Sequence, residues 1–116
     1  MTVIYEINPP KIPQGEDIFN DEINSSLSKL LQRVSEISML CDGIHVTDSV
    51  LGTKRVSALT TGKLLKKKHP NLQITISMRV RDKDMDSIKQ IVQESIDLKL
   101  DGILVLKGDP SKENPT

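Results

Sequence analysis

Polar residues follow an apolar run near the carboxyl end of the chain, in a pattern that suits ligand binding. Residues 103–106 are apolar and lead directly to Lys107, Gly108 and Asp109. Such a run is typical of a buried parallel strand, and a glycine after it lets a ligand approach the backbone. Asp109 places a carboxylate where parallel α/β sheets gather their catalytic groups. Taken alone, the Gly-Asp-Pro sequence is more simply explained as a turn.

Polar residues also end three earlier segments, which favours a common site over a single turn. Residues 2–7, 43–48 and 72–78 are rich in β-branched side chains and are bounded by Pro, Gly and Asp, as strands are. Because side chains alternate along a strand, counting by twos separates the residues at the strand ends into two faces. One face is predicted to carry Glu6, Thr47, Ser77, Lys107 and Asp109, and the face under the helices Tyr5, Val46, Met78 and Leu106.

Each polar residue of this set also has an ordinary explanation. Glu6 could solubilise an exposed strand, Thr47 is a common strand former, and Ser77 could fill space. The convergence of polar side chains from four strands favours a binding site over these separate explanations.

Three predicted helices separate the strands. Apolar residues recur at steps of three and four over about 21–40, 53–68 and 84–99, which is the spacing of one helix face. Asp84 is the predicted N-cap of the third helix. The order βαβαβαβ indicates an α/β fold with a parallel sheet.

Four such units correspond to half of a (β/α)8 TIM barrel, because a whole barrel needs about 250 residues. A small open doubly wound sheet is the alternative, although the first turn, Asn8-Pro9-Pro10, is not a glycine-rich phosphate loop. We therefore expect residues 1–110 to form a half TIM barrel with four strands and three helices, and residues 111–116 to form a flexible tail.

The composition argues against several other classes of protein. The 16 basic and 16 acidic residues leave no net charge to attract nucleic acid or an anionic membrane. The sequence lacks an apolar run of membrane-spanning length and a signal peptide, so we expect a soluble, cytoplasmic protein. Cys41 is the single cysteine, which excludes an internal disulfide and zinc-type spacing, and predicts no metal site. We interpret Cys41 as a small buried apolar residue rather than a reactive thiol.

The sequence resembles the methylenetetrahydrofolate reductase family, whose members are flavin-dependent (β/α)8 barrels. The resemblance covers essentially the whole chain and the amino-terminal part of a family member. It rests on four segments in the right order and spacing, namely Tyr-Glu-Ile-Asn-Pro-Pro-Lys at 5–11, His-Val-Thr-Asp-Ser at 45–49 with Gly52 and Arg55, Arg-Asp-Lys-Asp at 81–84, and Leu-Lys-Gly-Asp-Pro at 106–110.

This resemblance implies a reaction and a cofactor. The implied reaction is the reduction of 5,10-methylenetetrahydrofolate to 5-methyltetrahydrofolate, with electrons from NAD(P)H through FAD, in one-carbon metabolism and methionine biosynthesis. Glu6 matches the family's general acid, and Asp109 matches the aspartate beside flavin and folate that stabilises the cationic intermediate. The residues implied to bind the cofactor are Thr47, Ser77, Lys107, Gly108 and Asp109.

Two of these positions depart from the family pattern. Lys107 replaces a common arginine, which keeps the charge but loses the bidentate fork. Ser77 stands where some members have a histidine. Both departures affect how strongly a flavin would bind more than they affect the fold.

The resemblance leaves strands five to eight of the barrel without a counterpart. We expect either a fragment that lacks the carboxyl-terminal half of a reductase or a half-barrel that assembles with another chain, as in a homo-oligomer. Alone, the chain is expected to lack reductase activity and to bind FAD weakly or not at all. The competing function is a non-catalytic half-barrel that binds a partner chain, because a bare sheet exposes the edges of its first and fourth strands.

Overall fold

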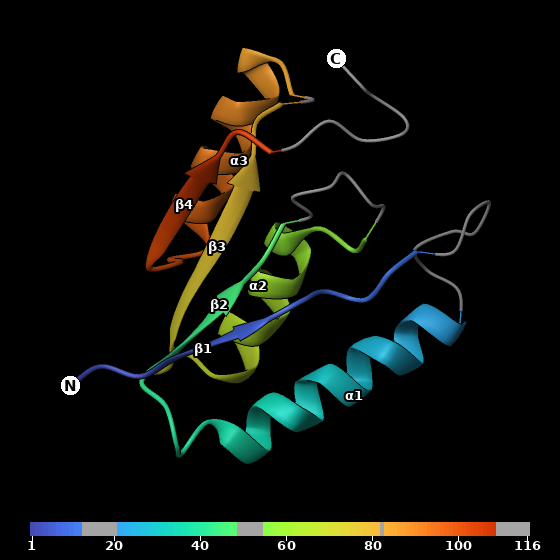
Figure 1. Cartoon of the computed structure of the whole chain (residues 1–116), viewed down its shortest axis with the longest axis vertical. Helices are drawn as coiled ribbons and strands as arrows, with labels where there is room; N and C mark the ends of the chain where they lie inside the picture. Colours follow the sequence, from blue (N-terminus) through green and yellow to red (C-terminus); the bar gives the residue numbers. More distant parts are fainter. Residues whose placement is uncertain (13–20, 49–54, 82, 109–116) are drawn as a thin grey trace.

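The protein folds as a four-stranded sheet with three helices, shown in Figure 1 as a computed structural model. The structure describes residues 1–12, 21–48, 55–81 and 83–108. In chain order the elements are β1 (Ile4–Ile7), α1 (Asp21–Ile37), β2 (Gly43–Val46), α2 (Ala58–Lys68), β3 (Gln73–Arg79), α3 (Met85–Asp97) and β4 (Gly102–Leu106).

All strands of the sheet are parallel, in the order β1-β2-β3-β4. Each strand therefore pairs with its neighbour in sequence, and a helix makes each crossover, as the βαβαβαβ pattern predicts. Figure 1 shows the strands fanning out with the twist expected of a parallel sheet.

The three helices cover one face of the sheet. Val34 of α1 and Leu65 of α2 are both fully buried in a core with the apolar residues of the two central strands, Ile44, Val46, Ile74 and Ile76. Ile91 of α3 lines a small hollow together with Ile76 and Met78 on the same side. A doubly wound sheet would need helices on both faces, so this alternative is wrong and the half-barrel prediction is confirmed.

Side-chain hydrogen bonds set the starts of two helices. Asp84 caps α3 as predicted, because its Oδ1 accepts a hydrogen bond from the Ser87 N–H at 2.8 Å. Ser57 caps α2 by accepting from the Thr60 N–H at 3.0 Å. The helix expected from about residue 53 therefore begins at Ala58, because Ser57 has an extended backbone.

The predicted apolar faces of the helices are only partly buried. Met85 and Ile96 of α3 are each 62% exposed, and Leu40 is 78% exposed beyond the end of α1. Helical spacing alone does not distinguish a buried residue from one at the border of an apolar face. Cys41 is half-buried against the core, close to its predicted role. Among the helices that the structure describes, none is long and apolar enough to cross a membrane.

Candidate active site

The face of the sheet opposite the helices, here called the inner face, carries a group of polar side chains. Paired residues on adjacent parallel strands point to the same side of a sheet. The register pairs Glu6 with His45 and His45 with Thr75. Because side chains alternate, the polar residues of the inner face are Glu6 of β1, His45 of β2, Thr75, Ser77 and Arg79 of β3, and Thr47 just beyond β2.

Glu6 lies on β1, at the edge of the sheet, and its side chain is exposed. It borders an open hollow of about 430 Å³ whose lining also includes Lys29 and Arg33 from α1. Because α1 covers the opposite face, this hollow lies at the edge of the sheet and is not part of the inner face. The prediction that Glu6 and Ser77 belong to the same side of the sheet agrees with the register.

Thr47 and Ser77 lie two residues beyond His45 and Thr75, toward the carboxyl ends of β2 and β3. The Thr47 hydroxyl donates a hydrogen bond to Asn8 Oδ1, which connects the ends of β1 and β2. Ser77 is only 4% exposed, and its hydroxyl lies 2.7 Å from His45 Nε2. The structure thus brings Glu6, Thr47 and Ser77 to one face, with Ser77 nearly covered.

The end of β4 differs from the prediction. Arg79 pairs with Leu106, so Leu106 faces the inner side rather than the helices, and the alternation places Lys107 on the other side. Alternation within a strand shows which residues share a face, but the register with the neighbouring strand decides which face that is. Since β4 is apolar on both faces, its sequence does not indicate which of its side chains face the helices. Asp109 and the predicted tail, 111–116, lie outside the described residues.

Gly108 makes a close backbone contact at the end of β4. Its φ of +86° lies in the left-handed region, and a Cβ added there would lie 2.6 Å from Arg79 Cγ. Arg79 is 2% exposed, and its backbone N–H donates to Asp48 Oδ2 at 2.7 Å. Arg81 Nη1 donates to the Gly108 carbonyl at 3.4 Å. Glycine is therefore required here for both backbone conformation and space.

His45 and Thr75 are inner-face residues that were not among the predicted site residues. His45 Nδ1 lies 2.7 Å from the Thr75 hydroxyl, and Nε2 contacts Ser77 on the other side. Both residues border a shallow, mainly apolar hollow of about 300 Å³ over Gly102, Ile103 and Leu104. The same counting by twos, continued one step back from Thr47 and Ser77, would have found them.

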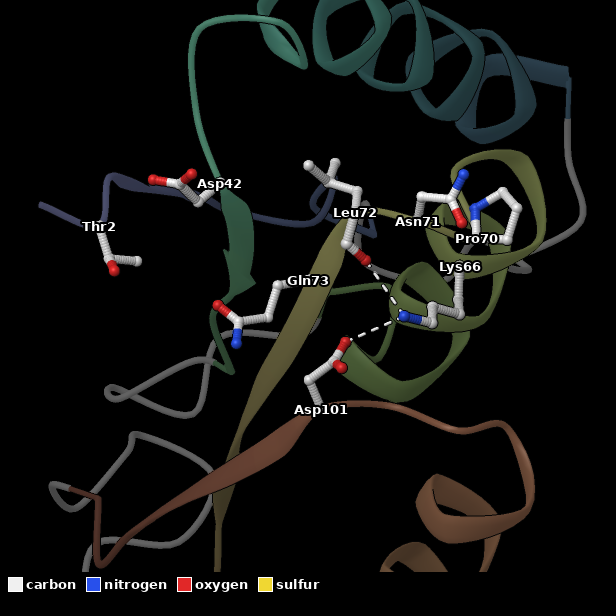
Figure 2. Close-up of a pocket in the computed structure, with 8 residues that line it drawn as sticks. All are labelled: Thr2, Asp42, Lys66, Pro70, Asn71, Leu72, Gln73 and Asp101. Carbon is white, nitrogen blue, oxygen red and sulfur yellow. Dashed lines mark hydrogen bonds and ion pairs between the residues drawn. The ribbon is translucent and has the colours of Figure 1, made fainter.

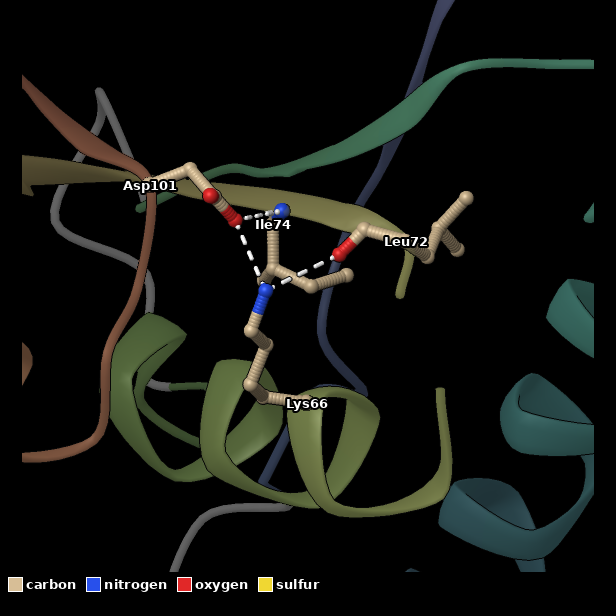
Figure 3. Close-up of polar contacts among 4 residues, drawn as sticks. All are labelled: Lys66, Leu72, Ile74 and Asp101. Carbon is tan, nitrogen blue, oxygen red and sulfur yellow. Dashed lines mark hydrogen bonds and ion pairs between the residues drawn. The ribbon is translucent and has the colours of Figure 1, made fainter. Parts of the chain in front are cut away.

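Another hollow, of about 450 Å³, lies at the amino-terminal ends of the strands (Figure 2). Its main charged groups bind each other, since Lys66 Nζ lies 3.0 Å from Asp101 Oδ2. Asp101 also accepts from the Ile74 N–H at 2.7 Å, and Lys66 donates to the Leu72 carbonyl at 3.1 Å (Figure 3). These contacts tie α2 to the starts of β3 and β4, and they indicate a structural role for the cluster.

The pKa of Asp101 reflects opposing effects in this cluster. Burial raises the pKa, while the hydrogen bond from Ile74, the hydrogen bond from Lys66 and the positive charge of Lys66 lower it. The combined effect is a pKa below the ordinary value of an aspartate. The cluster therefore holds Asp101 as a carboxylate.

The fold and the inner face together define a parallel α/β half-barrel with polar groups gathered toward the carboxyl ends of its strands. The family model for methylenetetrahydrofolate reductase matches residues 1–116. The chain therefore belongs to the methylenetetrahydrofolate reductase family, and its four parallel strands are the arrangement of half a TIM barrel. A search of curated proteins finds no match.

Proposed function

We propose that the protein is a methylenetetrahydrofolate reductase-like flavoprotein that reduces 5,10-methylenetetrahydrofolate to 5-methyltetrahydrofolate, with electrons from NAD(P)H through FAD. The observation that carries the proposal is the placement of Glu6, Thr47 and Ser77 on one face of a sheet of this family, the face that none of the described helices covers. Active sites of TIM barrels lie at this end of the strands. A cytoplasmic location is part of the proposal.

The described residues fit a flavin. Thr47 supplies a hydroxyl on the inner face, where its oxygen can still accept a hydrogen bond from a ligand. Lys107 is exposed at the end of β4, but it lies on the side of the sheet opposite Thr47, so the register does not support its proposed contact with the same ligand. FAD, when bound, would supply the hydride. Ser77 is nearly buried, so its proposed part in binding is exerted chiefly through His45.

Glu6 would act as the general acid. Its carboxyl group would give a proton to the amine nitrogen of the folate as the methylene bridge opens, and the resulting carboxylate would recover a proton from water. In the proposed division of roles, Asp109 remains a carboxylate that stabilises the cation formed by this opening. Two carboxyl groups in different surroundings can perform these two tasks.

A partner is also part of the proposal. Leu104 and Val105, on opposite faces of β4, are 59% and 58% exposed, and β1 and β4 form the two edges of the described sheet. Exposed apolar edges favour association with further strands, from the remainder of a reductase or from another copy of the chain. The same observation supports the second candidate function, a non-catalytic half-barrel that binds a partner chain.

The test of the catalytic proposal is Glu6→Gln in the natural, FAD-loaded protein. The rate of folate reduction should fall about 10²- to 10⁴-fold, because only this half-reaction needs the proton. Flavin reduction by NAD(P)H should change little. Glu36→Gln, an exposed position on α1, is the matched control. Equal loss of both half-reactions would assign Glu6 a structural role and favour the non-catalytic candidate.

A further inference from the structure

His45 connects a covered hydroxyl to an accessible one. Its Nε2 contacts the hydroxyl of Ser77, which is 4% exposed, and its Nδ1 contacts the hydroxyl of Thr75. Both distances are 2.7 Å, and both hydroxyls belong to β3. His45 and Thr75 border the hollow over Gly102, so a ligand or water can reach the Thr75 hydroxyl.

The two neutral forms of the imidazole give Thr75 opposite roles. When the proton is on Nε2, His45 donates to Ser77, and Thr75 donates to Nδ1 and offers only its lone pairs to a ligand. When the proton is on Nδ1, His45 donates to Thr75, Ser77 donates to Nε2, and the Thr75 proton is free to face a ligand. Hydroxyl groups fit both arrangements because each can donate and accept.

We propose that His45 is a positioning residue whose two neutral tautomers present the Thr75 hydroxyl to an inner-face ligand as a hydrogen-bond acceptor in one form and a donor in the other. The ligand class is a planar heterocycle whose ring nitrogen accepts a hydrogen bond in one oxidation state and donates in the other. This inference rests on the proposed function for the presence of such a ligand. The apolar lining from Ile103 and Leu104 suits a planar ring.

The proton count is the same in both arrangements. Thr75, His45 and Ser77 carry three exchangeable side-chain protons in each, and only the imidazole proton changes its atom. One proton leaves Nε2 and another is added to Nδ1, by exchange with water in the hollow. Glu6 is the register neighbour of His45 on β1, and Arg79 is the charged residue further along the inner face of β3.

The test is nitrogen NMR of the two histidine rings in the full chain without flavin, at about pH 8, where imidazoles are neutral. In the wild type, both ring nitrogens of His45 should have shifts between those of protonated and unprotonated nitrogens. An unpaired N–H costs more than an unpaired acceptor. Thr75→Val should therefore move the tautomer ratio about fivefold or more toward Nε2–H, and Ser77→Ala should move it as far toward Nδ1–H.

His69 provides an internal reference because its Nε2 contacts Ser35, between α1 and the end of α2, and its tautomer ratio should stay constant. A single fixed tautomer of His45, or the same ratio in both variants, would overturn the inference. In a second step, excess FAD should change the His45 ratio. Quenching of FAD fluorescence without a change at His45 would also overturn the inference. Absence of FAD binding would instead count against the proposed function, and the flavin-free spectra would still decide the tautomer result.

Discussion

At the scale of single residues, Gly108 and Gly102 differ sharply in what they tolerate. Both glycines lie on or just after β4, but Gly108 has a φ of +86° and touches the Arg79 side chain. A Cβ at Gly102 would meet only Thr75 Cγ2, at 3.4 Å. Gly108 is therefore a position where the backbone itself determines the residue type.

Gly108→Ala should lower the free energy of unfolding by about 1–2 kcal/mol or more, from the left-handed backbone alone. The contact with Arg79 adds to this loss. Gly102→Ala should change stability much less, because the methyl group needs only a small shift of Thr75. Urea unfolding of the two variants beside the wild type measures the difference. Equal losses would show that the turn at Gly108 is not as the structure describes.

At the scale of the elements, the Asp101 cluster links α2, β3 and β4 at the amino-terminal ends of the strands. Asp101→Asn keeps an oxygen for the Ile74 N–H but removes the charge that faces Lys66. We expect a loss of about 1 kcal/mol in unfolding free energy at pH 7. The loss is modest because the Asp101 side chain is 34% exposed, so solvent screens the ion pair.

The pKa of Asp101 gives this loss a pH dependence. A carboxyl group with a lowered folded pKa stabilises the fold above its unfolded pKa, about 3.9, and this stability disappears as the pH falls through the folded pKa. The difference between wild type and Asp101→Asn should therefore shrink below about pH 4. Asp97→Asn, an exposed position on α3, is the control. A difference that stayed constant from pH 7 to pH 3 would contradict the assignment.

The strand segments and the cap of α3 could be predicted from the sequence because they depend on local chemistry, whereas the Ser57 cap of α2 was not predicted. The alternation of β3 placed Met78 and Ser77 on opposite faces, and Asp84 was recognisable as a cap. The orientation of Leu106 could not be read, because it depends on the register between β3 and β4. The pairing of His45 with two hydroxyls was also hidden, since it depends on contacts between strands far apart in sequence.

At the scale of the whole molecule, the described chain forms one wall of a barrel. The helices cover the outer face, while Glu6, Thr47 and His45 belong to the inner face. A ligand on this face can be buried only if further strands form a second wall. The same wall would exclude water, and electrostatic stabilisation of the reaction depends on that exclusion. The proposed reductase activity therefore depends on association with further strands.

Titration of the purified 116-residue chain with FAD, followed by flavin fluorescence, tests the central claim that the inner face is the cofactor site. A micromolar site that loses about 3–4 kcal/mol of contacts would bind at about 0.1–1 mM, and we predict saturable quenching in this range. Thr47→Val should weaken binding about fivefold, because one hydroxyl contact is removed. Ser28→Ala, an exposed position on α1, should leave binding unchanged. Equal binding by the wild type and Thr47→Val, or binding by the wild-type chain alone in the low micromolar range, would contradict this account.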